Sequence, residues 1–294
     1  MPELPDIVVY QECLESKIGA AKLVRLRVND PFLQRTAEVP ISAAEGQTVC
    51  GIRRIGKRIV VALENEVFLV FHLMIAGRLH WWDRPVSPKD RATLAAMAFE
   101  HGHVAMTESG SKRRASLHIV RGEEALAALN PGGLDVLAIG FDAFSAQLRA
   151  DNHTLKRALT DPHRFSGIGN AYSDEILHRA RLSPFAQTAR LSDADARRLY
   201  EASQAVLGEW IERLRAEARS GWPAKVTAFR PAMAVHGKFG QPCPVCGAPV
   251  QRIVHAENET NYCARCQTGG RLLADRTLSR LLKASWPRSI DELG

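Results

Sequence analysis

Two close cysteine pairs stand near the C-terminal end of the chain. They have the sequences Cys243-Pro-Val-Cys246 and Cys263-Ala-Arg-Cys266, with sixteen residues between them. Four thiolates on two tight turns are the ligand set of a tetrahedral structural zinc ion, and they leave no position open for a reactive water. The sequence therefore predicts one Zn²⁺ that stabilises the fold and takes no part in chemistry.

A glycine-rich stretch, Phe165-Ser-Gly-Ile-Gly-Asn170, is the second candidate for a site. Helix-prone segments, 155–161 and 171–179, flank it on both sides. Glycines in a turn between helices let backbone amides approach a phosphate closely, but a tight turn can also need glycine for steric reasons alone. The stretch therefore predicts either a phosphate contact or a purely structural turn.

The elements that must position these groups fall into a β-rich half and a helical half. Short β-prone runs fill residues 22 to about 120, including 22–28, 59–63 and 67–73. The turn formers Asn130-Pro-Gly-Gly133 end this pattern, and we place a domain boundary there.

Two helices are predicted from apolar periodicity. The first lies at the N-terminus, with Asp6 as N-cap and an apolar face formed by Ile7, Tyr10, Leu14 and Ile18. The second covers 192–220, with a capping box of Ser192 and Asp195 and Gly221 as C-cap. Its apolar stripe is predicted to be a core face that consists of Leu199, Ser203, Val206, Leu207, Trp210, Ile211 and Leu214.

Charge and composition narrow the class of protein. The formal net charge is +7, which suits a polyanionic partner. No segment approaches the roughly 18 uninterrupted apolar residues that span a bilayer, so we expect no membrane association. The N-terminus lacks the basic start and apolar stretch of a secretion signal, which predicts an intracellular protein.

Several short motifs occur together, in order, from residue 2 to about residue 267. The set resembles the formamidopyrimidine-DNA glycosylase and endonuclease VIII family, and it consists of Met-Pro-Glu-Leu-Pro-Asp at 1–6, Gly56-Lys57, His72-Leu73, Gly-Ile-Gly-Asn at 167–170, Tyr-Ser-Asp-Glu at 172–175, and the cysteine pairs.

The resemblance implies an α+β fold with an N-terminal two-layer β-sandwich, a helix-two-turn-helix domain and a C-terminal zinc finger. The predicted domains are a catalytic β-sandwich at 1–130, a DNA-binding helical domain at 131–235, a four-cysteine zinc finger at 236–270 and an extension at 271–294. The implied partner is double-stranded DNA with damaged bases or abasic sites, bound between the halves. We expect a monomer in the cytoplasm, associated with the nucleoid.

The resemblance also assigns the chemistry to the N-terminus. Once Met1 is removed, Pro2 presents a secondary amine, which is neutral at pH 7 more often than a lysine and can attack C1′ of a damaged nucleoside. The resulting iminium acidifies the sugar protons, so that elimination cuts the strand. Glu3 would move protons at the sugar and the base, and Lys57 would contact phosphate near the lesion.

The remaining family positions are DNA contacts. Asn170 matches a phosphate-binding asparagine, and Lys156 matches a lysine near the flipped base, although Lys156 could simply lie on a helix face. Such enzymes rotate the damaged nucleotide out of the stack and fill the gap with side chains. Here Met74 or Ile75 would be the inserted apolar side chain, and Arg113 would face the orphaned base.

The chain departs from the family pattern at several positions. Ala115 replaces the aromatic residue after Arg113-Arg114, and Asp6 replaces a glutamate. Asn258 replaces a phosphate-binding arginine of the finger, for which Arg252, Arg265 or Arg271 could substitute. Beyond the last cysteine, 272–283 has the pattern of an amphipathic helix, which we expect either to pack on the helical domain or to bind DNA or a partner.

Three alternatives stay open beside a glycosylase and abasic-site lyase that acts on oxidised bases. The same chemistry could act on oxidised pyrimidines, hydantoins or unusual adducts, as in endonuclease VIII. The chain could bind damaged DNA without catalysis, although an intact Pro2 and Glu3 argue against this. A zinc-finger transcription regulator would need a recognition helix in the major groove, which nothing in the sequence demands.

Overall fold

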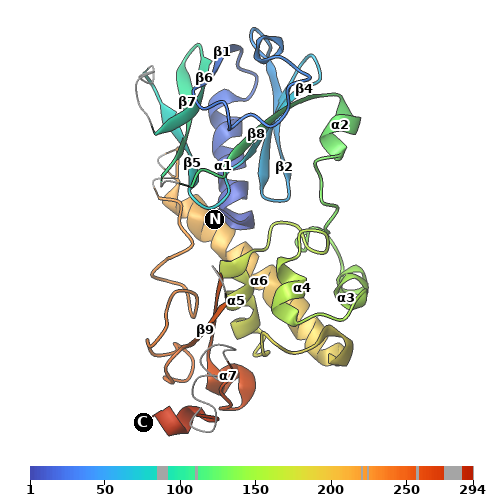
Figure 1. Cartoon of the computed structure of the whole chain (residues 1–294), viewed down its shortest axis with the longest axis vertical. Coiled ribbons are helices and arrows are strands. Elements are labelled where there is room, and N and C mark those ends of the chain that lie inside the picture. The colour runs from blue at the N-terminus through green and yellow to red at the C-terminus, as the bar shows by residue number, and fades with distance from the viewer. Residues whose placement is uncertain are drawn as a thin grey trace. The chain divides into compact units, whose positions relative to one another are not determined.

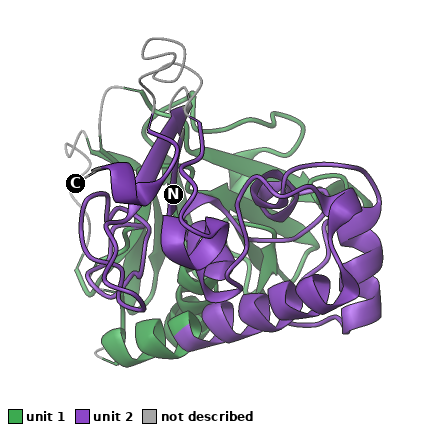
Figure 2. Ribbon diagram, turned by 90° about the horizontal axis from the view of Figure 1, so that it is seen from below, with its two compact units in different colours: residues 1–131, 210–227 green, residues 132–209, 228–294 purple. Residues whose placement is uncertain are grey.

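The chain divides into two compact units, which Figure 2 colours separately. The structure, a computed structural model, describes residues 1–84, 92–109, 112–219, 221–223, 225–255, 258–274 and 287–293. Unit 1 comprises 1–131 and 210–227, and unit 2 comprises 132–209 and 228–294. The first boundary falls inside the Asn130–Gly133 turn, whereas the finer division into four domains stays a prediction.

Unit 1 is a two-layer β-sandwich, and its strands can be followed in Figure 1. One antiparallel sheet has the order β1-β6-β7-β5 and the other has the order β2-β3-β4-β8. The strands are β1 Leu23–Val28, β2 Val49–Ile55, β3 Arg58–Leu63, β4 Val67–His72, β5 Gly77–Trp82, β6 Thr93–Phe99, β7 Gly102–Glu108 and β8 Ser116–Arg121. The three β-prone runs of the sequence therefore became β1, β3 and β4.

The core of unit 1 lies between the sheets and against helix α1, Leu4–Ile18. The predicted apolar face of this helix is fully buried, since Ile7, Tyr10, Leu14 and Ile18 are each at most 1% exposed. The outer face of β3 and β4 carries a second apolar cluster that includes Leu126 of helix α2, Glu123–Ala127. A short 3-10 turn, η1, covers Ile41–Ala43.

The start of α1 differs from the prediction. Glu3 is the N-cap, and Asp6 is the third helical residue, whose carboxylate accepts a hydrogen bond from the Glu3 backbone N–H at 3.0 Å. Pro5 lies in the first turn, where its missing N–H costs nothing and its fixed φ suits a helix, so the helix begins before Asp6. The prediction of Asp6 as N-cap was therefore wrong, and Asp6 instead closes a capping box.

Unit 2 contains the helical part of the chain. Its helices are α3 Phe141–Arg149, α4 Leu155–Thr160, α5 Asn170–Arg179 and most of α6 Asp193–Glu217, with a 3-10 turn η2 at Thr188–Arg190. The Ser192 hydroxyl accepts from the Asp195 N–H at 3.1 Å, as predicted, and the stripe of α6 is buried. The helix ends at Glu217, so Gly221 is not its C-cap.

The zinc-finger part of unit 2 is a β-hairpin followed by a short helix. It consists of β9 Gln251–His255, β10 Asn258–Tyr262 and α7 Ala264–Thr268, and a 3-10 turn, η4, follows at Ile290–Leu293. Leu272 and Leu273 are not helical and pack in the core of the finger. The predicted helix over 272–283 was wrong at these residues, because the Leu272 N–H bonds the Arg288 carbonyl instead. Residues 275–283 of that segment lie outside the described residues.

No helix within the described ranges combines the length and the apolar character needed to cross a membrane.

Candidate active site and zinc site

The N-terminal residues of unit 1 are enclosed by the fold. Pro2 is buried, and Glu3 and Asp6 are 2% and 3% exposed. Burial lowers the pKa of the terminal amine, which belongs to Met1 in this chain; Glu3 opposes the shift and Arg78 adds to it. Lowering the pKa of an amine increases its neutral fraction, which is the form that can act as a nucleophile.

Lys57 lies in the tight turn between β2 and β3, directly after Gly56, whose φ of +58° favours glycine. Burial lowers the pKa of Lys57, and the Glu3 carboxylate raises it. Glu3 therefore acts electrostatically on both Lys57 and the terminal amine. The structure brings the three predicted catalytic residues, Pro2, Glu3 and Lys57, into one charged group at the start of α1.

His72 ends β4 beside this group. Burial, followed by the charges of Arg58 and Lys57, lowers the pKa of His72 to about 4. The imidazole is therefore neutral at pH 7 and adds no further positive charge. His72 pairs with Arg58 across the strands, so the sheet fixes its backbone.

The turn after His72 presents the two predicted apolar side chains. Leu73 is 1% exposed and belongs to the core, whereas Ile75 is 52% exposed and Met74 is half-buried. Met74 has a φ of +51°, a left-handed conformation that costs a non-glycine residue about 1–2 kcal/mol. The turn closes through the Gly77 N–H and the Leu73 carbonyl at 2.9 Å, where a Cβ on Gly77 would lie 2.2 Å from that oxygen.

Arg113, another predicted DNA contact of unit 1, forms an ion pair with an acidic residue. Its guanidinium donates to the Asp30 carboxylate at 2.8 Å, and this bond lowers the pKa of Asp30. Backbone N–H groups of Arg114 and Ala115 donate to the Glu108 carboxylate at 3.0–3.1 Å. Ala115 is 3% exposed and lies in the apolar core, so its side chain faces the protein.

In unit 2, Lys156 belongs to a buried charge network. Its ammonium contacts Asp174, which is 0% exposed, and donates to the Asn170 carbonyl at 3.3 Å. The other Asp174 oxygen lies 2.8 Å from Nδ1 of His236 and accepts from the Asn261 N–H at 3.2 Å. Through Asp174, the network links Lys156 of α4 and the backbone of Asn170 in α5 to the finger hairpin.

Asn170 is the first residue of α5, directly after the glycine turn. Gly167 has a φ of +83°, so the turn needs glycine there. The N–H groups at a helix N-terminus attract anions, which agrees with a phosphate contact at this end of α5. One turn further on, the buried Glu175 carboxylate accepts from three backbone N–H groups, those of Ala234, Val235 and His236, at 2.7–2.9 Å.

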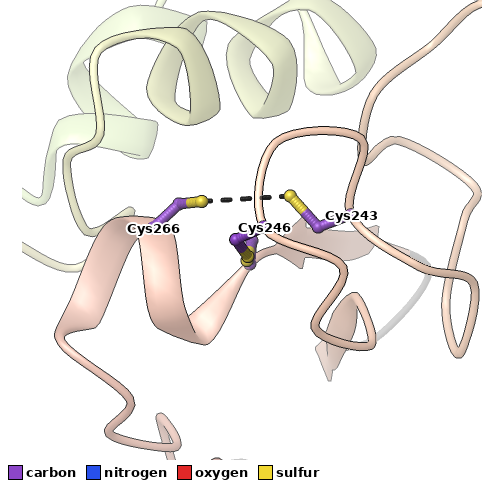
Figure 3. A group of neighbouring side chains, drawn as sticks. Cys243, Cys246 and Cys266 are labelled. Carbon is purple, nitrogen blue, oxygen red and sulfur yellow. Dashed lines mark hydrogen bonds between the residues drawn. The ribbon is translucent and has the colours of Figure 1, made fainter.

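The four predicted zinc ligands converge in the finger. Their sulfur atoms all lie within 4.8 Å of one another. The Cys243–Cys266 and Cys246–Cys263 sulfur distances are 3.9 and 3.4 Å. Figure 3 shows Cys243 and Cys266 facing each other across the group. Zn–S bonds of about 2.3 Å in a tetrahedron place sulfurs roughly 3.8 Å apart, so these cysteines fit one structural zinc ion.

The predicted residues fall into two separate groups. Unit 1 carries Pro2, Glu3, Lys57, Met74, Ile75 and Arg113, and unit 2 carries Lys156, Asn170 and the four cysteines. Sequence reasoning missed the residues that hold them in place, above all Asp30, Glu108 and His236. Asp30 and His236 have partners 83 and 62 positions away, and Glu108 binds only backbone N–H groups, so no side-chain pattern in the sequence marked these residues.

Models of three protein domains match the chain in order. The formamidopyrimidine-DNA glycosylase N-terminal domain matches residues 1–118, the H2TH domain of that enzyme matches 133–220, and the zinc finger found in FPG and IleRS matches 240–269. These matches agree with the sandwich, the helical part and the four-cysteine site described above.

Individual proteins give the same result. A formamidopyrimidine-DNA glycosylase of Thermus thermophilus is 32% identical over 279 residues, which cover 92% of this chain and 100% of that protein. An uncharacterised formamidopyrimidine-DNA glycosylase-like protein of Mycobacterium tuberculosis is 42% identical over 164 residues, 53% of this chain and 95% of its own length.

Solved structures share the fold. The crystal structure of MutM (Fpg) from Thermus thermophilus has a TM-score of 0.76 at 33% identity, with 90% of this chain and 98% of that chain covered. A Lactococcus lactis Fpg complex with DNA containing an abasic site has a TM-score of 0.80 at 23% identity, covering 90% and 99%. With three domain models matched in order and a relative aligned over its whole length, the chain belongs to the formamidopyrimidine-DNA glycosylase family.

Proposed function

We propose that the chain is a base-excision DNA glycosylase with abasic-site lyase activity, which removes oxidised bases through a Schiff base on Pro2. The observation that carries the proposal is the group at the start of α1, where Pro2 and Glu3 are buried and the charges of Glu3 and Lys57 act on the terminal amine, which belongs to Met1 in this chain. Family membership supports the glycosylase activity. The Lactococcus lactis protein of the same fold binds abasic-site DNA, and we extend that partner to this chain.

The mechanism needs removal of Met1, which exposes the Pro2 nitrogen. Its lone pair attacks C1′ of the damaged nucleoside, and the bond from C1′ to the base breaks as the base leaves with a proton. The Pro2 nitrogen then loses its proton, and its lone pair forms an iminium with C1′ as the bond from C1′ to the ring oxygen breaks and that oxygen takes up a proton. Removal of a C2′ proton then breaks the C3′–O bond and releases the 3′ phosphate. Glu3, 2% exposed, is the group that moves these protons.

The other site residues bind the substrate in this proposal. Lys57 and Asn170 contact phosphates, and Lys156 lies near the extruded base. Ile75, which is 52% exposed, enters the gap left by that base, with Met74 supporting it and Arg113 facing the orphaned base. We further propose that the enzyme acts as a monomer inside the cell, at the nucleoid, on double-stranded DNA.

Borohydride trapping tests the nucleophile. The processed, zinc-loaded protein is incubated with duplexes that contain an abasic site, an oxidised purine or an oxidised pyrimidine, and mass spectrometry then locates any reduced adduct. We expect an adduct on the terminal proline, and its relative yield on the lesion duplexes distinguishes a purine from a pyrimidine specificity.

Three variants support the assignment. Pro2→Gly and Glu3→Gln should each lower trapping on lesion duplexes by about 100-fold or more. Pro5→Ala is the matched control, because it removes a proline from the same first turn without touching the terminal amine, and it should trap like the wild type. A protein that binds damaged duplexes but gives no adduct on any of them would establish the binding-only alternative instead.

A further inference from the structure

A tight turn follows strand β1 at Asp30-Pro31-Phe32-Leu33. The Leu33 N–H donates to the Asp30 carbonyl at 3.0 Å, and the Phe32 N–H donates to Oδ1 of Asp30 at 3.0 Å. Pro31 occupies the second turn position, where its fixed φ is favoured, and an aspartate at the first position caps the turn through its side chain. These features make the turn stiff.

The sandwich anchors this turn at both ends. Before it, the Asn29 N–H donates to the Leu94 carbonyl at 2.8 Å, and the Asn29 amide donates to the Thr93 carbonyl at 3.0 Å. After it, Leu33 is 2% exposed, and its carbonyl accepts from the Leu117 N–H at 2.8 Å. The backbone of Phe32 is therefore fixed relative to both sheets of unit 1.

Phe32 itself projects into solvent. Its side chain is 79% exposed, compared with 52% for Ile75, the apolar side chain proposed above to enter the DNA. An exposed ring gains little from the hydrophobic effect in the isolated chain. Aromatic rings fixed on a positively charged surface are typical of sites that stack on unpaired bases.

The same carboxylate that caps the turn also holds an arginine. Oδ1 of Asp30 binds the Phe32 N–H, and Oδ2 binds the Arg113 guanidinium at 2.8 Å. One side chain thus joins an exposed ring and a cation from segments 81 positions apart in the chain (113 − 32). The neighbouring Ala115 is buried in the core and offers no surface to a ligand.

We propose that Phe32 is a DNA contact, which provides beside Arg113 the aromatic surface on which a base next to the orphaned base stacks. The proposal rests on the proposed function, in which Arg113 faces the orphaned base. Stacking on an aromatic face is tolerant of sequence, so Phe32 adds affinity for a disrupted duplex without selecting one base. An intact duplex keeps its bases stacked on one another and offers the ring no free face.

Equilibrium binding to two duplexes tests the role of Phe32. One duplex contains a tetrahydrofuran analogue of an abasic site, and the other is undamaged with the same sequence. Phe32→Ala should weaken binding to the abasic duplex by about tenfold, as expected for one lost base–aromatic stack, and change binding to the undamaged duplex by less than about twofold. Phe32→Tyr keeps the ring and should bind like the wild type.

Val24→Ala is the matched control, because Val24 is a 52% exposed apolar side chain on the strand that leads into the turn. It should leave both affinities unchanged, and the urea midpoint of Phe32→Ala should equal that of the wild type, since an exposed side chain contributes little to stability.

The outcomes separate the two proposals. If the wild type is trapped by borohydride and prefers the abasic duplex, but Phe32→Ala keeps that preference, the role of Phe32 is wrong and the proposed function stands. Equal weakening on both duplexes would also overturn the stacking role, because it would indicate a general surface contact. A wild type with neither an adduct nor a preference for the abasic duplex would overturn the proposed function and the Phe32 role together.

Discussion

The scaffolds that carry the functional residues differ between the two units. In unit 1 the loops that carry Ile75 and Arg113 are attached to a sandwich whose interior is apolar, with side chains such as Leu69 and Leu117 fully buried, and charged contacts such as Arg113–Asp30 lie outside that core. In unit 2 the residues proposed to bind DNA rest on buried charges and on four thiolates, with Asp174 at 0% exposure in the centre of the network.

The difference matters because these forces respond to different conditions. Hydrophobic burial is non-directional and changes gradually with the area removed from water. A buried ion pair or a metal site depends on every partner being present in the right state, so losing one partner costs much more than the pair contributes. Unit 2 should therefore be the part that loses stability first when zinc is removed, a buried charge is deleted or a buried group changes its protonation state.

Removal of zinc should have the largest effect. A structural zinc contributes about 10–16 kcal/mol to the folding of an isolated finger, so chelation should unfold the residues that pack around it. Hydrogen exchange before and after chelation should show protection lost in β9 and β10 and kept in β3 and β4. Metal analysis of the untreated protein should give one zinc per chain.

Cysteine variants control this experiment. Cys263→Ser removes a ligand and should reproduce the effect of chelation, whereas Cys50→Ser removes an exposed cysteine far from the metal group in sequence and should have no effect. If hydrogen-exchange protection were lost equally from the finger and the sandwich, the proposed difference between the units would be wrong.

Loss of the Asp174 carboxylate should come next. Asp174→Ala leaves Lys156 inside the fold without its acidic partner and removes the acceptor for His236, which should cost about 3–5 kcal/mol in the free energy of unfolding. Urea unfolding measures this change. The effect should be smaller in the double variant Lys156→Met with Asp174→Leu, which leaves no unpaired charge.

Asp193→Ala gives the comparison at the surface of the same unit. Asp193 also pairs with a cation, Arg149, at 2.7 Å, but its side chain is 90% exposed, so the loss should be under about 1 kcal/mol. If the two single variants were equally destabilised, buried charge would not be what distinguishes unit 2.

Local patterns made much of this architecture predictable. The spacing of Ile7, Tyr10, Leu14 and Ile18 predicts the buried face of α1. Residues three or four positions apart lie on the same side of a helix, and an apolar side packs against the core. The cysteine spacing predicts the zinc site for a similar reason, because a tight turn alone brings each pair together. The match of the motifs in order then identified the family.

The supporting residues could not be predicted because their partners are distant in sequence. Asp174 meets His236 62 positions later, and Asp30 meets Arg113 83 positions later. No local rule selects one acid among the 32 acidic residues of the chain for such a contact. The misplaced N-cap of α1 has a local cause, since Asp6 is a good cap by type but Pro5 let the helix start earlier.

The pH dependence of stability should show the smallest effect, with opposite signs in the two units. Burial lowers the pKa of His72 in unit 1 to about 4, below the 6.5 of an unfolded chain. Between pH 6.5 and 4 the unfolded chain binds more protons, so the contribution of His72 to stability is present above pH 6.5 and is lost as the pH falls. Burial raises the pKa of Glu175 in unit 2 above the 4.5 of an unfolded chain. The contribution of Glu175 to stability is therefore present below pH 4.5 and is lost as the pH rises from 4.5 through the higher pKa of the folded state.

Urea unfolding of His72→Asn and Glu175→Gln at pH 7 and pH 5 tests these signs. Each variant is compared with the wild type by the change in unfolding free energy between the two pH values. His72→Asn should lose less stability than the wild type on acidification, by about 2 kcal/mol, because each pH unit between 6.5 and 5 costs the wild type about 1.4 kcal/mol and the asparagine does not titrate. Glu175→Gln should lose more than the wild type, since it lacks the carboxylate whose protonation favours the folded state at low pH. A shift of the same sign in both variants would mean that burial does not govern the titration of the two units in opposite directions.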